Sequence, residues 1–592
     1  MLSRELSATS RRVTLERLPK ESWDLLVIGG GITGAGIALE GALRGLKVAL
    51  VERDDFASGT SSKSSKLLHG GLRYLEHGEF RLVHEALTQR NKLFHDASHL
   101  AKELPFLFPI YDEYGDNLTV MNAGLWLYDG LSSTSEFRMG RLHRKLRPQE
   151  TLEQEPTLRL DRMKGSLAYI DGLTEDARMT VETIKTAATW GAAIANHVEV
   201  TAFNKGPDGK VTGVTVRDLL SHETYSVFAR RVINATGPWS DRLARLEDPE
   251  AKPRLKPTKG VHLVVRKFTE KAIVLKSHEP KDPKKKRWMF IIPYGERTII
   301  GTTDTAHADD GTDAYLDRDI YASPAEIQYI LDSANDVCPG ANLKPEDVIA
   351  SFAGWRPLIA PPGEGVSESE ISREHEIFIS PAGVIGIAGG KYTTYRSMAR
   401  QVVEVAVKSL REEAWLPELA NRHCDEVPLS GGDLPSGDFD TYLQYAMETH
   451  PTIEPSLIRM LVSRYGSNYL VILSLMQADR GLDRFIVGLS PETPLLRAEI
   501  AYFVRFEMAV TLLDVMMRRT RLNLLDAHQG LEAVDEIAAV MSGALQTLEG
   551  WTEEERMQWV EAQVRAYQQE IEKARAIAAG QDPKDQTQGT PA

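Results

Sequence analysis

Residues 23–52 read WDLLVIGGGITGAGIALEGALRGLKVALVE, and this stretch decides the fold. An apolar run at 25–28 leads into a glycine cluster and a small-residue helical pattern, and a second apolar run at 48–51 ends at Glu52. This order predicts a strand, a tight turn, a helix and a parallel strand. Three glycines, Gly29, Gly31 and Gly34, have the G-x-G-x-x-G spacing. The first allows the turn, the second lets the backbone approach a pyrophosphate, and the third lets the helix lie close to the sheet.

The turn is predicted to bind the ADP half of a dinucleotide. Phosphate would meet the free N–H groups and the positive end of the helix, which starts at Ile32 and Thr33. Glu52 is placed to accept hydrogen bonds from a ribose. The alternative is a glycine-rich crossover without a ligand, but the strand, helix, second strand and acidic residue occur in the required order. The stretch alone does not distinguish NAD from FAD.

Composition restricts the class of protein. With 592 residues, 42% apolar and 26% charged, the chain has the make-up of a soluble globular protein with two or three domains. Its net charge of −14, from 70 basic and 84 acidic residues, argues against nucleic-acid binding. An anionic substrate would therefore need a local concentration of cations.

The sequence predicts neither a metal site or disulfide nor a membrane-spanning or secretory segment. Cys338 and Cys424 have neither metal-binding nor C-x-x-C spacing, so we expect two free thiols and no metal site. No run approaches the ~18 apolar residues of a spanning helix, and residues 1–22 carry mixed charges without an apolar core. We expect the cytoplasm or the cytoplasmic face of the inner membrane as the location.

A loop rich in small polar residues follows the opening motif. Residues 57–71 are dense in Ser, Gly and Thr and have no apolar period, so they suit wrapping a cofactor that needs many hydrogen bonds; the alternative is a flexible linker. A helical pattern from about 79 to 102 is expected to end at Pro105. A second helix at 176–190 precedes a β-meander whose last run ends at Asn234–Trp239, where small residues would again admit a cofactor.

The second half of the chain changes character twice. Residues 255–305 read as antiparallel strands facing a substrate, and a helix is predicted at 324–337 with Ser323 as its N-cap and Pro324 in its first turn. Gly389 to Thr393 stands at the start of an amphipathic helix, which repeats the opening turn. From 411 onward the patterns are helical, at 440–448, 455–477, 497–519, 530–547 and 552–578, with Met508–Met517 expected in the helix core.

These motifs together resemble the FAD-dependent glycerol-3-phosphate dehydrogenases, which belong to the amino-acid-oxidase-like flavoproteins. The resemblance runs from about residue 22 to about 570. It is carried by residues 24–62 (DLLVIGGGITGAGIALEGALRGLKVALVERDDFASGTSS), 64–76 (SSKLLHGGLRYLE), 234–239 (NATGPW), 259–265 (KGVHLVV), 299–304 (IIGTTD), 355–358 (WRPL), 389–396 (GGKYTTYR) and 518–526 (RRTRLNLLD).

The fold class that this resemblance implies is mixed α/β and α+β. A Rossmann-like FAD-binding domain is expected at 22–105, 160–250 and 345–408, with an antiparallel-sheet cap domain for the substrate at 106–159 and 251–344. An N-terminal extension (1–21), an all-α domain (411–578) and a disordered tail (579–592) complete the expected organisation. The residues expected to contact FAD are Gly29, Gly31, Ile32, Thr33, Gly34, Glu52, Arg53, Thr60, Ser61, Ser62, Ser64, Leu68, His69, Gly70, Gly71, Val198, Ala235, Thr236, Gly237, Trp239, Gly354, Gly390, Lys391, Tyr392 and Thr393.

The implied reaction is oxidation of sn-glycerol 3-phosphate to dihydroxyacetone phosphate, by hydride transfer from C2 to N5 of FAD. In the family pattern the substrate is held by Arg73, Tyr74, His262, Thr303, Asp304, Arg356 and Lys391. A phosphate monoester requires cations with fixed geometry, which suits arginine. His262, or Arg356 acting with a water, would take the C2 hydroxyl proton, and the helix start at Gly390–Thr393 would stabilise negative charge on the reduced flavin. His262, Arg356 and Lys391 are the expected catalytic residues.

Several alternatives stay open. Electrons would pass to a membrane quinone, which requires peripheral contact with the membrane; the rivals are an oxygen-dependent glycerol-3-phosphate oxidase, an amine oxidase on the same scaffold and a non-enzymatic flavin sensor. The basic stretch Lys281–Arg287 is a solvated hairpin tip or, with Trp288 and Phe290, a contact for anionic headgroups. A homodimer is compatible with the sequence.

Overall fold

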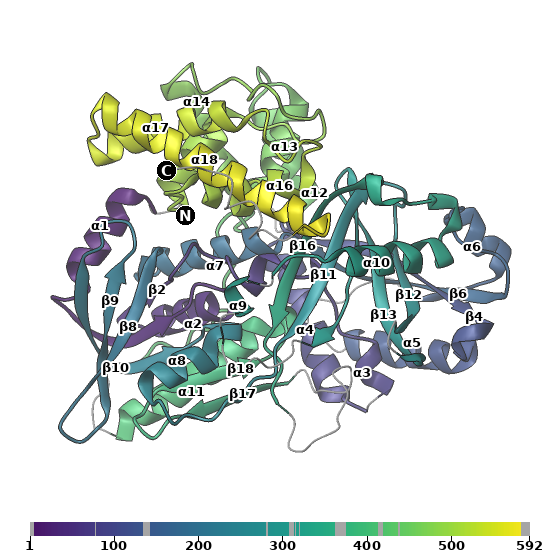
Figure 1. Ribbon diagram of the computed structural model, residues 1–592, viewed down its shortest axis with the longest axis horizontal. Helices are drawn as coiled ribbons and strands as arrows, with labels where there is room; N and C mark the ends of the chain where they lie inside the picture. The colour runs from purple at the N-terminus through teal and green to yellow at the C-terminus, as the bar shows by residue number, and fades with distance from the viewer. Residues whose placement is uncertain are drawn as a thin grey trace.

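The computed structural model of the chain describes residues 5–581 except 77, 134–141, 280–281, 307–312, 314, 319, 361–373, 413–417 and 436–437. The side chains of 73, 76, 278, 279, 282–285 and 318 also lie outside this description. The predicted tail, 579–592, falls outside it from residue 582 onward. Two sheets with helical layers lie side by side, and a group of helices from the C-terminal third packs across both (Figure 1).

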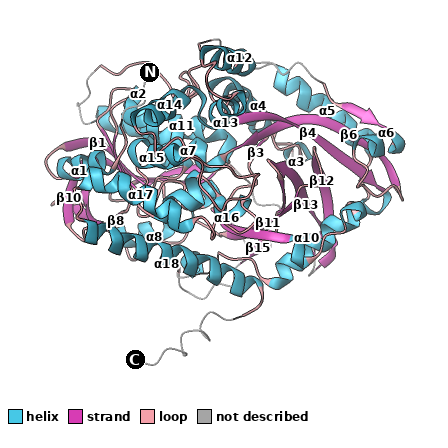
Figure 2. Cartoon of the chain, turned by 90° about the horizontal axis from the view of Figure 1, so that it is seen from above, coloured by secondary structure: helices cyan, strands magenta, loops and turns pink. Residues whose placement is uncertain are grey.

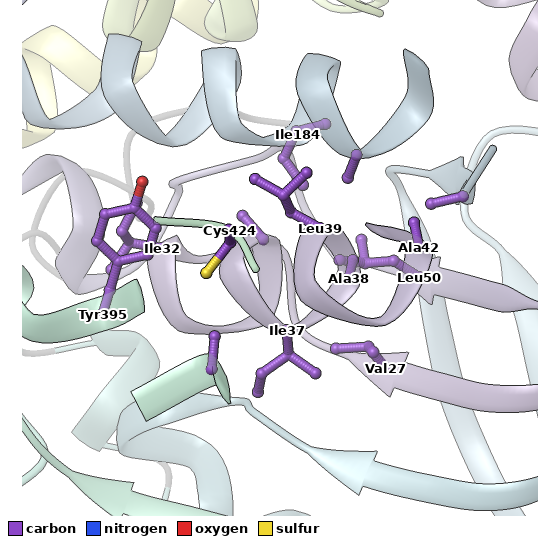
Figure 3. Close-up of a cluster of buried hydrophobic side chains, with 14 of the residues drawn as sticks. Val27, Ile32, Ile37, Ala38, Leu39, Ala42, Leu50, Ile184, Tyr395 and Cys424 are labelled. Carbon is purple, nitrogen blue, oxygen red and sulfur yellow. The ribbon is translucent and has the colours of Figure 1, made fainter. Parts of the chain in front are cut away.

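The opening stretch folds as predicted. Strand β1 (Ser22–Ile28), helix α2 (Ile32–Leu43) and strand β2 (Val48–Val51) form a parallel unit in which Leu25 pairs with Val48. Small residues let α2 be buried along nearly its whole length: a Cβ on Gly36 would lie 2.9 Å from the ring of Tyr395. Figure 3 shows α2 between α7 and the sheet, with Ile37, Leu39 and Ala42 packed into this core.

The first sheet has the strand order β17-β18-β10-β1-β2-β7, and a meander of β8, β9 and β10 extends it. Helices α2, α7 and α11 share a core on one face, and α1 and the meander cover the other. Its remaining elements are α1 (Ala8–Arg17), α7 (Asp176–Thr189), β7 (Ala193–Ala195), β8 (Val198–Lys205), β9 (Val211–Asp218), β10 (Thr224–Asn234), α8 (Ser240–Glu247), β17 (His375–Ile379), β18 (Ile385–Gly389) and α11 (Tyr395–Glu412).

The second sheet has the order β15-β11-β14-β13-β12-β4-β6-β3, with β16 paired to β11 and β5 to β6. Helices α4 and α5 pack on one face and α10 on the other. Its elements are β3 (Leu67–Leu68), α3 (Arg73–Glu76), α4 (Phe80–Asp96), β4 (Ala101–Tyr111), α5 (Leu118–Ser133), β5 (Arg144–Leu146), α6 (Pro148–Gln154), β6 (Met163–Thr174), β11 (Thr258–Arg266), β12 (Ala272–Glu279), β13 (Asp282–Tyr294), β14 (Arg297–Gly301), β15 (Thr305–Ala306), α9 (Tyr315–Arg318), α10 (Pro324–Val337) and β16 (Val348–Arg356).

The strands of the second sheet do not follow the predicted domain bounds. Strand β3, the first residues of β4, and strands β6 and β16 pair within the second sheet, although the ranges 22–105, 160–250 and 345–408 were expected to belong to the first domain. Within the predicted N-terminal extension, the described residues 5–21 include helix α1. Helix α1 is capped by Ser7, and its Arg11 donates a hydrogen bond to the carbonyl of Asn196, 2.9 Å away.

In the described residues of the C-terminal third, helices joined by turns and loops predominate (Figure 2), as predicted, and one isolated β-bridge links Phe485 to Leu496. Its elements are α12 (Phe439–Thr449), α13 (Pro455–Tyr465), α14 (Tyr469–Ala478), α15 (Arg497–Phe506), a π-helical turn (Asp514–Arg519), α16 (Leu522–Leu525), α17 (Val534–Glu549) and α18 (Glu553–Ala578). Met516 is buried in the core of these helices, as expected, whereas Met508 follows the end of α15 and is buried in the core of the first sheet. None of the helices in the described part of the chain is both long enough and apolar enough to cross a bilayer.

Three predicted helices were wrong in extent. The helix expected at 79–102 ends at Asp96, and Pro105 lies inside β4, where it pairs with Ile170 of β6. The helix expected at 455–477 is interrupted at Gly466, which has φ +54°, and that expected at 497–519 ends at Phe506 before Met508, which has φ +53°. Helix α10, in contrast, has the predicted bounds, with Ser323 accepting a hydrogen bond from the N–H of Glu326.

Candidate active site

A cavity of about 840 Å³ runs between the two sheets. It starts at the glycine turn, passes the loop after β2 and the end of β10, and reaches β11, β16 and the turn before α11. The structure brings most of the predicted site residues together in its lining: Gly29, Gly31, Ile32, Thr33, Glu52, Arg53, Thr60, Ser61, Ser64, His69, Tyr74, Val198, Ala235, Thr236, Gly237, Trp239, His262, Gly354, Arg356, Gly390, Lys391, Tyr392 and Thr393.

The glycine turn is packed too tightly for side chains. Gly29 has φ +113°, and a Cβ there would lie 2.6 Å from the carbonyl oxygen of Ala235, at the end of β10. A Cβ on Gly34 would lie 1.9 Å from the carbonyl oxygen of Gly29, so the third glycine seats α2 against the turn. The N–H of Ile32 donates to the hydroxyl of Ser61 at 2.9 Å, which joins the start of α2 to the following loop.

Glu52 is held at the mouth of this turn. Its carboxylate accepts hydrogen bonds from the N–H of Gly30 at 2.5 Å and from the N–H of Asp54 at 2.8 Å. Burial raises the pKa of Glu52 to about 7, although the two N–H groups act in the opposite direction. This is the carboxylate that was predicted from the sequence to accept hydrogen bonds from a ribose.

The loop after β2 is a fixed structure. The hydroxyl of Thr60 donates to the carbonyl of Trp355 at 2.7 Å, and Ser64 donates through its N–H and its hydroxyl to Asp176 at 3.1 and 2.6 Å. The ammonium of Lys66 lies 2.8 Å from the same carboxylate, in a fully buried ion pair. The flexible-linker reading is therefore wrong, because Asp176 and Trp355 fix the loop from two sides.

His262 lies on β11 and is 2% exposed. Its Nε2 is 2.8 Å from the hydroxyl of Ser65, and its ring stacks on Phe352 with centroids 4.7 Å apart. Burial, together with the charges of Lys66 and Arg356, lowers the pKa of His262 well below its usual value of 6.5. The imidazole is therefore neutral at physiological pH and can accept a proton.

Arg356, at the end of β16, is held in one orientation by hydrogen bonds to residues that do not line the cavity. Its Nη1 donates to Asp304 at 3.0 Å, and its Nη2 donates to the hydroxyl of Thr302 at 2.8 Å and to the carbonyl of Thr303 at 2.9 Å. Gly260 of β11 provides the space, because a Cβ there would lie 2.5 Å from Nη2. These contacts fix the plane of the guanidinium, as bidentate recognition of a phosphate requires.

Lys391 also lines the cavity, in the turn before α11. Its ammonium is 3.7 Å from the centre of the Tyr74 ring, and Gly389 and Gly390 adopt φ +73° and +96° to form the turn. A short 3₁₀ turn, Tyr392–Thr394, then leads into α11 at Tyr395. The side chain of Arg73, also predicted at this place, lies outside the described residues.

Some predicted site residues lie behind the cavity wall. Thr303 and Asp304, predicted to bind the substrate, are not among the residues lining the cavity: Asp304 and the carbonyl of Thr303 accept from Arg356, and the hydroxyl of Thr303 accepts from the N–H of Val261. Ser62 accepts a hydrogen bond from Lys66 through its carbonyl, Leu68 is buried in β3, and the N–H of Gly70 donates to the hydroxyl of Tyr128. Gly34 and Gly71 also act by packing: a Cβ on Gly71 would lie 2.3 Å from the Tyr74 ring.

Sequence reasoning missed two lining residues that bear on the chemistry. Lys63 lines the cavity, and burial, with the nearby charge of Arg518, lowers its pKa to about 8. Ser65 also lines it and contacts His262. Both lie in the Ser-rich loop that was predicted to wrap a cofactor. The composition of the whole loop indicated a role in the cavity, but nothing in the sequence marked Lys63 or Ser65 individually.

The residues present fit a flavin dinucleotide. The glycine turn and the start of α2 suit a pyrophosphate, Glu52 suits a ribose, and the cavity continues past these groups to His262 and Lys391. An NAD site at the same turn does not require the Ser-rich loop, the end of β10 and the turn before α11 to close around it. The geometry thus favours FAD.

Comparisons with known proteins agree with this geometry. Residues 24–396 match the family model of FAD-dependent oxidoreductases, and residues 423–556 match the C-terminal domain of alpha-glycerophosphate oxidase. The aerobic glycerol-3-phosphate dehydrogenase of Staphylococcus haemolyticus is 36% identical over 549 residues, which cover 91% of this chain and 94% of that protein. The chain belongs to the FAD-dependent glycerol-3-phosphate dehydrogenase family.

Further relatives support this membership. Glycerol-3-phosphate dehydrogenase 2 of Mycobacterium tuberculosis is 38% identical over 556 residues, covering 92% of this chain and 88% of that protein. The glycerol-3-phosphate dehydrogenase of Bacillus halodurans, solved in complex with FAD, has 31% identity and a TM-score of 0.71, and the match covers 98% of this chain and 99% of that chain. The predicted family, fold class and cofactor are confirmed.

Proposed function

We propose that this protein oxidises sn-glycerol 3-phosphate to dihydroxyacetone phosphate, with FAD as its cofactor. One observation carries the proposal: a single cavity joins the dinucleotide-binding turn to His262, Arg356 and Lys391. The relatives named glycerol-3-phosphate dehydrogenase match nearly the whole chain, which includes both ends of this cavity.

Substrate binding follows from the charges in the cavity. The protein carries a net charge of −14, so a phosphate dianion is attracted only where cations are concentrated. Arg356 and Lys391 supply two cations to the cavity lining, and we propose that Arg73 supplies a third. Because Asp304 and Thr302 already fix the guanidinium of Arg356, little side-chain freedom is lost when the phosphate binds.

Proton transfer is assigned to His262. Its lowered pKa keeps the imidazole neutral, with one ring nitrogen unprotonated, and its position on the cavity wall places it to accept the C2 hydroxyl proton. FAD, when bound, is the acceptor for the hydrogen and the two electrons that leave C2. The turn Gly390–Thr393 presents backbone N–H groups and the start of α11, which we propose stabilise negative charge on the reduced cofactor.

The electron acceptor is proposed to be a membrane quinone. The closest rival is an oxygen-dependent oxidase with the same active site. Measuring quinone reduction and hydrogen peroxide release on the same preparation separates the two: the proposal predicts fast quinone reduction and little peroxide. Stoichiometric peroxide with slow quinone reduction would instead identify an oxidase.

Two other rivals predict a different response to substrate. An amine oxidase would have no use for several phosphate-directed cations in its cavity, whereas Arg356 and Lys391 both line this one. A flavin sensor would keep its flavin oxidised when glycerol 3-phosphate is added.

We also propose a cytoplasmic location and a homodimer; sedimentation measures the oligomeric state.

Contact with the membrane surface is proposed for helix α5, which packs on the second sheet through Met121, Leu125 and Tyr128. Its opposite side exposes Val120, Trp126 and Leu127, with exposed fractions of 65%, 56% and 42%. Leu142, exposed by 59%, and the exposed basic residues Arg144 and Lys145 follow in the chain. Apolar side chains beside basic ones suit an interface with anionic lipids.

The basic hairpin was predicted to be either a solvated tip or a contact for anionic headgroups that includes Trp288 and Phe290. Both aromatic side chains pack against the core of the second sheet, and Trp288 lies against Phe108 with ring centroids 4.9 Å apart, which makes the hairpin the weaker candidate for headgroup contact. Strand β13 turns these aromatic side chains inward because they alternate with the residues of its other face. The side chains of Lys284 and Lys285 lie outside the described residues.

Vesicle co-sedimentation tests the α5 proposal. Trp126→Asp combined with Val120→Asp is expected to reduce binding to vesicles containing phosphatidylglycerol at least about fivefold, since two inserted apolar groups are lost. Phe228→Asp, a change at a 51% exposed apolar residue on β10, serves as the matched control and is expected to bind as the wild type. Unchanged binding of the α5 variant would exclude this helix as the contact.

A further inference from the structure

The loop that lines the cofactor cavity is fixed at both ends by arginines of the C-terminal helical domain. The loop begins after Asp55 and ends at Lys66, and its residues Thr60, Ser61, Lys63, Ser64 and Ser65 line the cavity. Arg518, Arg519 and Arg521 come from the π-helical turn Asp514–Arg519 and the residues after it. These arginines are more than 450 residues from the start of the loop in sequence, yet they contact its anchors directly.

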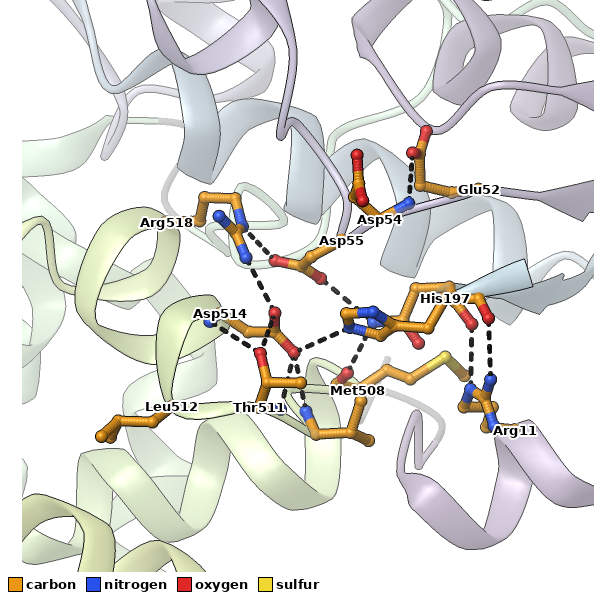
Figure 4. A network of polar contacts seen from close by, with 12 residues as sticks. Arg11, Glu52, Asp54, Asp55, His197, Met508, Thr511, Leu512, Asp514 and Arg518 are labelled. Carbon is orange, nitrogen blue, oxygen red and sulfur yellow. Dashed lines mark hydrogen bonds and ion pairs between the residues drawn. The ribbon is translucent and has the colours of Figure 1, made fainter. Parts of the chain in front are cut away.

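The first anchor is the buried carboxylate of Asp55. Arg519 binds it with two hydrogen bonds, of 2.7 and 3.0 Å, and the Nε of Arg518 adds a third at 2.6 Å. Figure 4 shows Arg518 between Asp55 and Asp514, whose carboxylate also accepts from Arg518 at 2.8 Å and lies 3.2 Å from His197. Because Asp55 is fully buried, its charge depends on these partners.

The second anchor is the buried carboxylate of Asp176. Arg521 contacts its Oδ1, while its Oδ2 accepts from Ser64 at 2.6 Å and from the ammonium of Lys66 at 2.8 Å. Arg521 itself adopts a left-handed conformation, with φ +57°. A non-glycine residue in this conformation is disfavoured, so the surrounding packing must hold it there.

The anchored loop touches both functional parts of the cavity. Near the first anchor, Ser61 accepts a hydrogen bond from Ile32 at the start of α2, where the pyrophosphate is expected. Near the second anchor, Ser65 contacts His262, and the ammonium of Lys66 lies 4.8 Å from the ring of Phe352, on which His262 stacks. The C-terminal domain is therefore connected to the cofactor site through two separate carboxylates, those of Asp55 and Asp176.

We propose that Arg518, Arg519 and Arg521 are positioning residues, through which the docked C-terminal domain holds the cofactor loop closed around FAD. The Asp55 anchor acts on the pyrophosphate end, and the Asp176 anchor acts on both the loop and the surroundings of His262. The domain is thus part of the cofactor-binding machinery. The inference rests on FAD as the cofactor, and FAD binding is measured without substrate, so a wrong substrate assignment would leave its test intact.

The first experiment measures the dissociation constant of FAD for the full-length protein, by the fluorescence of released flavin. Arg519→Met and Arg521→Met are each expected to raise this constant at least about tenfold. Combining Arg519→Met with Asp55→Asn removes the buried carboxylate that has lost one of its two arginine partners, and is expected to restore part of the affinity. The matched control is Arg464→Met, which removes an arginine bound to buried Glu499 within the same domain, 2.8 Å away. It is expected to stay within twofold of the wild type.

The second experiment uses Arg521→Ala, in which the missing group can be added back. Guanidinium chloride at a non-denaturing concentration is expected to restore FAD retention and the rate of flavin reduction at saturating glycerol 3-phosphate. Sodium chloride at equal ionic strength is expected to restore neither. If Arg519→Met fails to fold, Arg519→Lys and Asp55→Asn are measured in its place, with the same expected loss of FAD affinity.

The proposal would be overturned by either of two results. FAD affinity within twofold of the wild type in the folded arginine variants would show that the anchors do not hold the cofactor. An equal loss in Arg464→Met would show that general destabilisation, rather than the anchors, releases FAD.

Discussion

At the scale of single residues, Arg356 depends on a glycine of the neighbouring strand. Gly260 pairs with Gly354 across β11 and β16, and a Cβ on Gly260 would lie 2.5 Å from Nη2 of Arg356 and 2.7 Å from the hydroxyl of Thr302. Gly260→Ala is therefore expected to turn the guanidinium out of place and to lower kcat/KM about 10- to 100-fold. Steady-state kinetics with glycerol 3-phosphate checks this.

Arg356→Ala removes the guanidinium entirely and gives the largest loss of kcat/KM with which Gly260→Ala can be compared. Loss of a charged phosphate contact is expected to cost several kcal/mol of transition-state binding, or about 10³-fold in kcat/KM. The control is Gly543→Ala in α17, where a Cβ meets nothing within 4 Å. The control is expected to keep full activity. A value near that of the wild type for Arg356→Ala would refute the assignment of this residue.

The pH dependence of activity reports on His262. Burial and the charges of Lys66 and Arg356 keep the pKa of this imidazole well below 6.5, so the base should stay unprotonated to a lower pH than an ordinary histidine. We expect the acid limb of kcat/KM, corrected for the ionisation of the substrate phosphate, to lie below pH 6.5. His262→Asn is expected to lower kcat about 10²- to 10⁴-fold. An acid limb at or above pH 6.5 would contradict the environment described for His262.

Glu52 is expected to affect stability and cofactor binding in opposite directions. Its pKa is raised from 4.5 to about 7 by burial, so the folded state binds the proton more tightly. The stability of the FAD-free protein should therefore fall as the pH rises from about 4.5 through 7. Glu52→Gln is expected to stabilise the FAD-free protein at pH 8 by roughly 1–3 kcal/mol and to change little at pH 4.5.

The same substitution should weaken FAD binding about tenfold, because a neutral amide is a poorer acceptor for ribose hydroxyls. Thermal unfolding at the two pH values and a flavin titration measure both effects. Equal stability changes at pH 4.5 and pH 8 would show that the charge of Glu52 is not the cause.

At the scale of elements, the sequence predicted best where local chemistry and tertiary structure agree. The β1-α2-β2 unit follows from its glycines and apolar runs, and α10 follows from Ser323 and Pro324, which fix its start whatever packs against it. The cavity-lining loops were also predictable, because Ser- and Gly-rich segments at strand ends suit cofactor binding.

The elements that were missed depend on distant partners. A Cβ on Gly466 would lie 1.8 Å from the carbonyl oxygen of Gly431, so a loop from elsewhere in the chain divides the helix expected at 455–477. Pro105 is tolerated in β4 because pairing with β12 begins only at Phe106. The sequence also could not predict that Asp304 holds Arg356. Its motifs mark both residues as functional, but they do not show which of the two side chains lines the cavity and which supports the other.

At the scale of the whole molecule, the charge distribution separates two tasks. Arg356 and Lys391 line the cavity, and at the interface of the C-terminal domain Arg518, Arg519 and Arg521 pair with buried carboxylates. Breaking such a buried pair by removing one partner costs about 3–5 kcal/mol. The C-terminal domain and the cofactor domain are therefore expected to unfold in a single transition when FAD is bound.

The most direct measurement is anaerobic addition of glycerol 3-phosphate to the purified holoenzyme, followed by the absorbance of the oxidised flavin near 450 nm. The protein is expected to lose this yellow absorbance fully at about one equivalent of substrate, and to regain it when a quinone is added. His262→Asn and Arg356→Ala should lose it far more slowly. A flavin that stays oxidised with saturating glycerol 3-phosphate would contradict the central claim.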